Sequence, residues 1–111
     1  MLAQMTQAGL RTVSEHNFSV AVVAFARDHG WLVHYERRSG HVGADGQWRG
    51  SGPKGKPDLT LARDGKVLLV ELKKEKEKPS PEQEAWLLAL GPHGRLWRPR
   101  DAATIMEDLR E

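Results

Sequence analysis

The sequence contains no cysteine, which excludes disulfide bonds, zinc–thiolate sites and cysteine nucleophiles. It has no apolar run as long as a membrane span, and its first residues do not follow the pattern of a signal peptide. We therefore expect a cytoplasmic protein with no membrane partner. Excess charge is also small, because 17 Lys and Arg residues against 15 Asp and Glu leave a net charge of +2. That balance permits a nucleic-acid partner without requiring one.

The chain is long enough, at 111 residues, for one domain with its own core, so we expect a single domain over residues 1–111. Residues 1–13 show no clear periodicity and are expected to form a loose or briefly helical arm. Apolar periodicity and capping residues predict three helices, at about 15–29, 81–90 and after Asp101. Strands are expected at about 31–35, 59–62, 67–70 and 95–98. The predicted fold class is α/β, in the order α-β-β-β-α-β-α.

A glycine-rich, mainly basic segment covers residues 36–56, and we expect a flexible loop there. Its cations are candidates for contacts with a phosphate backbone, and its tryptophan is a candidate for stacking on a base. These candidates are Arg37, Arg38, Trp48, Arg49, Lys54 and Lys56. A solvated glycine linker explains the same composition. Lys74 is a further candidate DNA contact, although the charged run that contains it also suits a solvated strand exit.

The strongest local signal is a β-hairpin centred on Asp64-Gly65, which lies between two apolar runs. A two-residue turn at this dipeptide fixes the register and, counting outward from it, places Asp58 opposite Glu71. Opposite side chains share one face of a hairpin, with Cβ atoms about 4.5–5.5 Å apart. Lys73 lies two residues beyond Glu71 and points to that same face. The sequence therefore predicts two carboxylates and an ammonium group at one end of the hairpin.

Two like charges about 5 Å apart repel by roughly 3 kcal/mol at an effective dielectric constant near 20, and a bound divalent cation removes that cost. Carboxylates, water and phosphate oxygens suit Mg²⁺. Lys73 beside such a site would orient an attacking water or stabilise charge on a phosphorane-like transition state. The alternative is a solvated strand end with a surface pair between Glu71 and Lys73. The five histidines show no metal-ligand spacing, although the first strand could direct His34 toward the site.

Pro57-Asp58 followed, after twelve residues, by Glu71-Leu72-Lys73 resembles the PD-(D/E)xK nuclease superfamily. More narrowly, the chain resembles the VRR-NUC family in its small standalone form from phages and bacteria. The further matching stretches are Ser14-Glu15 with Phe18, Gly30-Trp31, Pro79-Ser80-Pro81-Glu82-Gln83, and Trp97-Arg98-Pro99 before Asp101. The chain departs from the family at Lys56, where a small residue is usual, and in its longer glycine-rich loop. Both departures concern substrate preference.

The resemblance implies a restriction-endonuclease-like mixed sheet flanked by helices. It also implies a metal-dependent DNA endonuclease that acts on branched DNA such as Holliday junctions, with Mg²⁺ as cofactor and Mn²⁺ able to substitute. Asp58 and Glu71 would be metal ligands and Lys73 the catalytic lysine. Glu15 and the Leu72 carbonyl would complete the metal environment. Small members of the family are expected to be homodimers.

Two residues implied by the resemblance also have local explanations. Glu15 suits the first turn of a helix, near the positive end of its dipole. Gln83 completes a capping box with Ser80, and the resemblance adds a place near the active site and a catalytic role. The alternative functions are a non-catalytic DNA-binding module on a nuclease fold and an adaptor that recruits a partner through its hairpin edge. Metal binding and salt-dependent DNA affinity would separate these alternatives.

Overall fold

A computed structural model describes residues 2–4, 13–36, 41–42, 44–45, 47–49 and 53–111 of the chain. Its helices are η1 (Leu2–Gln4), α1 (Glu15–Asp28), α2 (Pro81–Leu90), η3 (Gly91–His93), η4 (Pro99–Asp101) and α3 (Ala102–Arg110). Its strands are β1 (Leu32–Tyr35), β2 (His41–Val42), β3 (Trp48–Arg49), β4 (Leu59–Arg63), β5 (Lys66–Leu72) and β6 (Gly94–Trp97). The predicted order of the larger elements is confirmed, and β2 and β3 are additional.

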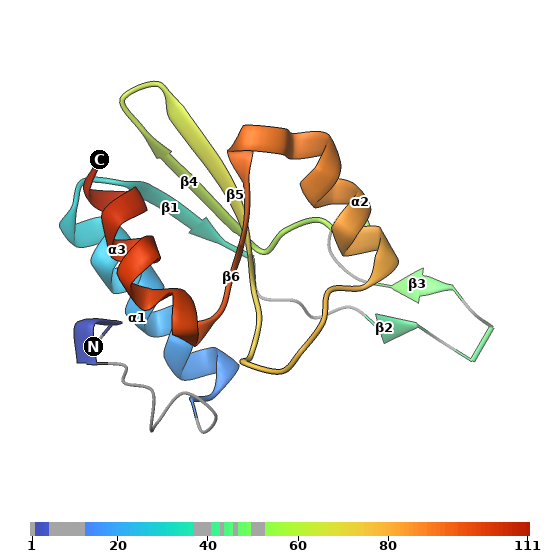
Figure 1. Ribbon diagram of the computed structural model, residues 1–111. Coiled ribbons are helices and arrows are strands. Elements are labelled where there is room, and N and C mark those ends of the chain that lie inside the picture. Colours follow the sequence, from blue (N-terminus) through green and yellow to red (C-terminus); the bar gives the residue numbers. More distant parts are fainter. Residues whose placement is uncertain (1, 5–12, 37–40, 43, 46, 50–52) are drawn as a thin grey trace.

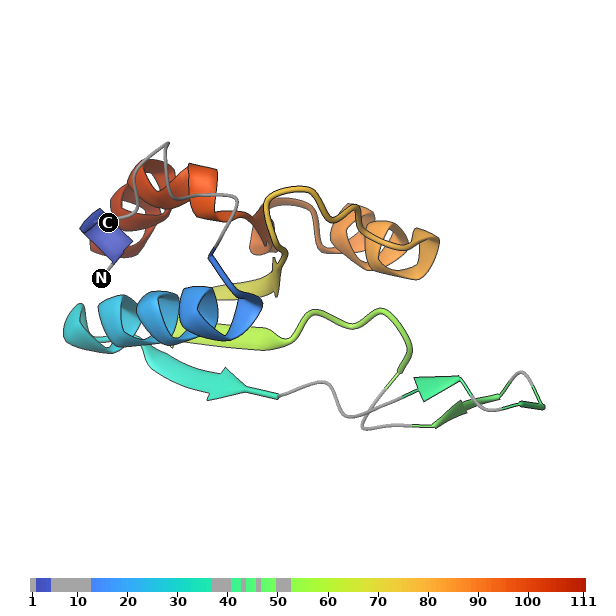
Figure 2. The same ribbon diagram turned by 90° about the horizontal axis from the view of Figure 1, so that it is seen from below.

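The main sheet is mixed and has the strand order β1-β4-β5-β6. The first two neighbouring pairs are antiparallel, whereas β5 and β6 are parallel and are connected through α2. Figure 1 shows α1 and α3 next to each other, with α2 away from them beside β6. The view from below in Figure 2 shows the same separation of α2 from α1 and α3. The fold is therefore a mixed α/β architecture, as predicted.

The hairpin of β4 and β5 has the predicted register, with Arg63 opposite Lys66 and Ala62 opposite Val67. Its turn residues, Asp64 and Gly65, both have positive φ values, 50° and 80°. A type I′ turn requires this of both central residues, and its twist matches that of the flanking strands. Local turn chemistry therefore sets the register of the strand pair that carries the candidate site.

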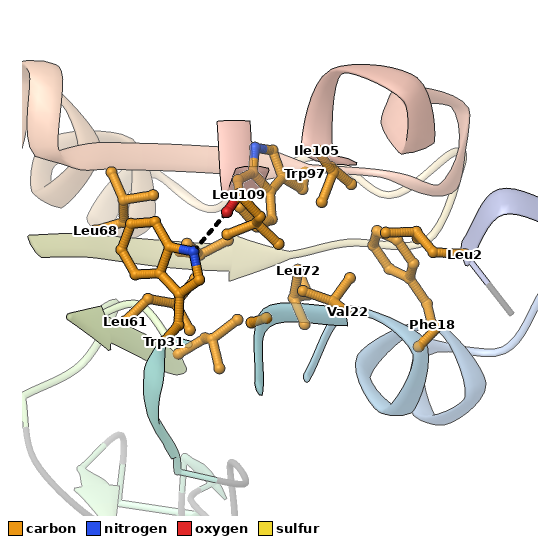
Figure 3. Packing of buried hydrophobic residues seen from close by; sticks show 14 of the residues in the cluster. Leu2, Phe18, Val22, Trp31, Leu61, Leu68, Leu72, Trp97, Ile105 and Leu109 are labelled. Atoms are coloured by element: carbon orange, nitrogen blue, oxygen red, sulfur yellow. Dashed lines mark hydrogen bonds between the residues drawn. The ribbon is translucent and has the colours of Figure 1, made fainter. Parts of the chain in front are cut away.

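The core lies between the sheet and the helix pair α1 and α3 (Figure 3). Apolar side chains at alternate positions of β5 point into it, because successive residues of a strand face opposite sides. The labelled members are Leu2, Phe18, Val22, Trp31, Leu61, Leu68, Leu72, Trp97, Ile105 and Leu109. Leu2 belongs to the N-terminal segment that was expected to be a loose or briefly helical arm, and it is buried within η1.

The helix ends follow the capping chemistry of the sequence. The Ser14 side chain accepts a hydrogen bond from the backbone of Asn17, and Ser80 forms the predicted capping box with Gln83. Asp101 precedes α3 as expected, but its carboxylate instead accepts from the backbone N–H of Arg98 and caps the short helix η4. The capping prediction for α3 was therefore wrong in its side-chain contact.

Two further expectations differ from the structure. The segment 36–56, predicted as a loop, contains the antiparallel pair β2 and β3. Trp86 of α2, an aromatic residue that its place on a helix favours for the core, is only half buried, because α2 lies apart from α1 and α3, beside β6. None of the helices in the described ranges combines the length and apolar character needed to cross a bilayer.

Candidate active site

The candidate site lies at the end of the β4–β5 hairpin that is opposite the turn. Leu59 pairs with Val70, so the next step of the same register places Asp58 opposite Glu71, as predicted. The backbone N–H of Glu36 donates to the carbonyl oxygen of Asp58 at 2.8 Å, which continues the β1 and β4 pairing beyond the strand end. The backbone of Asp58 is therefore fixed to the segment that follows β1.

The four predicted catalytic side chains, which include Gln83 at 2% exposure, are all buried. Asp58 is 7% exposed, Glu71 1% and Lys73 9%. The Lys73 ammonium lies 3.6 Å from Oε2 of Glu71. A buried carboxylate is costly unless charges or hydrogen bonds compensate it, and Lys73 supplies an opposite charge at short range. The alternative of a solvated surface pair between Glu71 and Lys73 was wrong.

Gln83 connects the first turn of α2 to this carboxylate. Its Nε2 donates to Oε2 of Glu71 at 3.2 Å, while its Oε1 accepts from the backbone N–H of Ser80 at 2.8 Å. The Ser80 hydroxyl in turn accepts from the backbone N–H of Gln83 at 3.2 Å. The capping interpretation of Gln83 is confirmed, and the same amide group also lies beside the candidate site. One oxygen of Glu71 is thus positioned by a helix cap.

Gly55 allows the segment before Asp58 to approach α2. Its φ is +89°, and a Cβ at this position would lie 2.6 Å from Cβ of Glu82 and 2.7 Å from the carbonyl carbon of that residue. A side chain of any kind would therefore collide with the first turn of α2. The glycine brings the Lys56-Pro57-Asp58 segment against the helix that also positions Glu71.

Asp58, Glu71 and Lys73 line one pocket with a volume of about 340 Å³. Its other lining residues come from the start of α1, the end of β1 and the segment after β5. The full lining comprises Glu15, His16, Tyr35, Asp58, Glu71, Lys73 and Glu77. Four of these residues carry carboxylates, and Lys73 lies among them. The pocket is thus rich in hard oxygen donors, the chemistry that Mg²⁺ prefers.

The predicted metal ligands can be compared with this geometry. Asp58 and Glu71 share the pocket, and two carboxylates are sufficient protein ligands for Mg²⁺, which keeps several water molecules. Among the residues that the structure describes, no three His, Asp or Glu side chains are grouped closely enough to hold a metal. Glu15 therefore lines the pocket without joining the other two carboxylates in such a group. Leu72 ends β5 with its side chain in the core, and ligation by its carbonyl stays a prediction.

Sequence reasoning missed three residues of the pocket, His16, Tyr35 and Glu77. The exception made for His34, that the first strand could direct it toward the site, does not hold, because His34 is exposed and its neighbour Tyr35 lines the pocket instead. Neighbouring residues of a strand point to opposite faces, so β1 directs Tyr35 rather than His34 toward the pocket. The amphipathic pattern of β1 is too short to fix this choice from the sequence.

Six of the seven predicted DNA contacts fall in the segment 36–56, and four of these six lie within residues 37–49, where the description is partial. Arg37 and Arg38 lie outside the described residues. Trp48 and Arg49 form β3, which pairs with β2 through the backbone register of Arg49 with His41. Their contacts with DNA stay predictions.

The three predicted lysine contacts are placed around α2 and the strand exit. The Lys54 ammonium lies 3.9 Å from a carboxylate oxygen of Glu82, and Lys56 is half buried. Lys74 is exposed, and its backbone N–H donates to the Glu77 carboxylate at 3.2 Å. The Lys74 backbone is thus bonded to a residue that lines the pocket, and contact of the exposed Lys74 side chain with DNA stays a prediction.

The structure thus brings Glu15, Asp58, Glu71 and Lys73 together in one pocket and adds Gln83 as a direct contact of Glu71. Two of these residues come from one hairpin, and the others come from α1, α2 and the strand exit. When the chain was compared with family models, with curated proteins and with solved structures, none of them matched.

Proposed function

We propose that the protein is a metal-dependent endonuclease that hydrolyses phosphodiester bonds of DNA, with branched DNA as its preferred substrate. The observation that carries this proposal is the burial of Asp58, Glu71 and Lys73 around one acidic pocket. Burying two facing carboxylates is unfavourable for a protein that only needs a stable fold. A cation site gives this arrangement a function, and the resemblance to VRR-NUC nucleases supports the same reaction.

The chain's own residues have distinct tasks in this proposal. Asp58 and Glu71 would hold Mg²⁺, with Mn²⁺ able to substitute, and Glu15 adds negative charge to the lining of the same pocket. The bound cation would supply Lewis-acid polarisation of the scissile phosphate and neutralise its charge. Gln83 fixes one oxygen of Glu71, so that the carboxylate is presented in one orientation. Catalysis by proximity and orientation requires a metal ligand that is held in one orientation in this way.

Lys73 is the positively charged side chain of the proposed site. Its ammonium is nearly enclosed and lies 3.6 Å from Glu71, so it stays within reach of a phosphate that enters the pocket. Three N–H donors are available to orient an attacking water or to stabilise charge that develops on phosphoryl oxygens. Preorganised donors of this type typically contribute a factor of 10² to 10³ to the rate.

A cleavage panel tests the proposal. The purified protein is incubated with a four-way junction, a flap, a blunt duplex and a single strand of matched sequence, each with Mg²⁺, Mn²⁺ or EDTA. We expect metal-dependent cleavage, fastest on a branched substrate. Complete absence of cleavage with both metals on all four substrates would overturn the proposal.

The same protein preparation separates the proposal from a non-catalytic DNA-binding module. Titration calorimetry with Mg²⁺ should detect binding that Asp58→Asn weakens strongly. A module that retains only DNA affinity would show salt-dependent retention on DNA without metal binding at this site. An adaptor protein would show neither property. We expect metal binding together with salt-dependent DNA affinity.

A further inference from the structure

A second hollow, with a volume of about 460 Å³, lies along α1 beside the candidate active site. Its lining residues on α1 are spaced by three or four positions, as expected for one face of a helix. They are His16, Ser19, Val20, Val23, Ala24 and Arg27, and Tyr35 of β1 also lines the hollow. We call this hollow the α1 groove.

The α1 groove adjoins the active-site pocket because His16 and Tyr35 line both. The chemistry changes between the two hollows. The pocket is lined mainly by charged groups, whereas Val20 and Val23 give the groove an apolar wall. Arg27 lies eleven residues after His16, which corresponds to about 17 Å along the helix axis. A ligand that leaves the pocket along the groove thus meets an aromatic ring, then apolar surface, then a cation.

The groove offers little hydrogen-bonding specificity. The Ser19 hydroxyl is buried and donates within its own helix to the carbonyl oxygen of His16 at 2.8 Å. The remaining central side chains, Val20, Val23 and Ala24, have no polar atoms. Proteins bind unpaired bases without sequence preference by stacking them on aromatic side chains along a positively charged groove, and Tyr35 and Arg27 supply these two features at the ends of the apolar wall.

We propose that the α1 groove binds unpaired nucleotides of the DNA strand whose phosphodiester lies in the active-site pocket. The proposal rests on the proposed endonuclease function and specifies its substrate class, a duplex with an adjoining single-stranded segment. Tyr35 and the valines provide the contact surface for bases, and Arg27 neutralises a backbone phosphate. An intact duplex keeps its bases stacked inside and would place phosphates against the valines. A second copy of the chain seated here would cover His16 and Tyr35 and close the pocket.

The test measures DNA affinity in EDTA, so that it does not depend on cleavage. Fluorescence anisotropy compares a duplex carrying a ten-nucleotide single-stranded tail with the matched blunt duplex. Val20→Glu places a charge in the groove at a side chain that is 43% exposed, and Ala24→Glu does so one turn later. Leu88→Glu, at an 86% exposed position on α2, introduces the same charge elsewhere. Thermal unfolding monitored by circular dichroism checks that each variant folds.

We expect each groove variant to weaken binding of the tailed duplex about five- to one-hundredfold, since base stacking contributes about 1–3 kcal/mol per base. Binding of the blunt duplex should change less than about twofold, and Leu88→Glu should behave as wild type. Arg27→Ala should reduce the slope of log affinity against log salt for the tailed duplex by about 0.7.

Three outcomes would overturn the inference. They are equal affinity of the wild type for both DNAs, tailed-duplex binding within twofold of wild type for both groove variants, and conversion of a wild-type dimer to a monomer by Val20→Glu in sedimentation. The last result would assign the groove to a second copy. If the wild type cleaves DNA but the groove variants bind normally, only this inference fails. If the variants lose tailed-DNA affinity but nothing is cleaved, only the endonuclease proposal fails.

Discussion

At the scale of single residues, the Glu71 carboxylate is the centre of the candidate site. One of its oxygens is near the Lys73 ammonium at 3.6 Å and accepts from Gln83 at 3.2 Å, in a region almost closed to solvent. A buried carboxylate whose partner is removed typically costs a protein several kcal/mol. The residues around Glu71 therefore act as a unit, so each substitution there calls for a measurement of stability beside the measurement of cleavage.

Lys73→Ala removes the ammonium while leaving the hairpin backbone intact. We expect the cleavage rate on branched DNA to fall at least about 10²-fold, because a preorganised donor to the reacting phosphate is lost. Affinity for the same DNA in EDTA should fall by less than about tenfold. Gel-based rates and anisotropy measure the two effects, and wild-type turnover by Lys73→Ala would contradict the assigned role.

Asp58→Asn removes one of two facing charges with almost no change in shape. Without metal, we expect the free energy of unfolding to rise by about 1–3 kcal/mol, because repulsion of Glu71 is relieved. Added Mg²⁺ should stabilise the wild type, by about 2.7 kcal/mol at a hundred times the Kd, and the variant much less. Urea denaturation with Mg²⁺ or EDTA measures both.

Asp64→Asn, at a side chain that is 87% exposed, is the matched control and should change neither quantity. Equal stabilisation of wild type and Asp58→Asn by Mg²⁺ would argue against the metal site.

At the scale of elements, the hairpin could be predicted because its signal is local. Asp64-Gly65 selects the turn, the turn sets the register, and the register places Asp58 opposite Glu71. The contact between Gln83 and Glu71 could not be derived in this way, because it depends on how α2 packs beside β5 and β6. The choice between His34 and Tyr35 also depends on where β1 joins the sheet. Side chains placed by local geometry were therefore predictable, whereas those placed by packing were not.

Ser80 and Gln83 separate the two tasks of the α2 cap. Ser80→Ala should lower the free energy of unfolding by about 1 kcal/mol through loss of the N-cap, while the Gln83 contact with Glu71 keeps cleavage within a few-fold of wild type. Gln83→Leu removes the amide's hydrogen bond with the Ser80 backbone and also its hydrogen bond to Glu71. It should therefore reduce both the free energy of unfolding and the cleavage rate. Chemical denaturation and initial rates provide the measurements. A larger loss of cleavage in Ser80→Ala than in Gln83→Leu would refute this division.

Gly55 and Gly65 form a second informative pair, because both have positive φ but only Gly55 faces backbone. Gly55→Ala should destabilise the protein more than Gly65→Ala by about 1–3 kcal/mol, the usual cost of forcing extra atoms into a packed position. It should also impair cleavage, since it displaces the segment that leads to Asp58. Thermal unfolding and cleavage rates of the two variants test this, and equal melting temperatures would contradict the close approach to α2.

At the scale of the whole molecule, a second polar cluster lies at the turn end of the hairpin. The Arg63 guanidinium donates to the carbonyl oxygens of His29, at 3.0 Å, and Leu109, at 2.8 Å, and lies 4.5 Å from the centre of the Trp31 ring. Trp31 also donates to Leu109, as Figure 3 shows. The end of α1, the hairpin and α3 therefore meet at one point, far along the strands from Asp58. Residues so distant in sequence give no local signal for this contact.

Arg63→Met should lower the free energy of unfolding by about 2–4 kcal/mol, since hydrogen bonds from a charged donor and a cation–π contact are lost together. Cleavage measured below the melting temperature should remain near wild type, because the cluster lies at the opposite end of the hairpin from the pocket. Lys66→Met removes an exposed cation from the same region and should cost less than about 0.5 kcal/mol. A variant Arg63→Met with unchanged stability would show that the cluster is dispensable.

The side-chain amide of Gln83 bonds both to the start of α2 and to the Glu71 carboxylate, and this has a consequence for inactivation by heat. The first turn of a helix is among the parts of a protein that fray earliest, and Gln83 lies within the first turn of α2. Fraying there would release Glu71 while the layer of α1 and α3 against the sheet persists. Catalytic competence should therefore decline at temperatures where spectroscopy still reports a fully folded chain, and it should return on cooling.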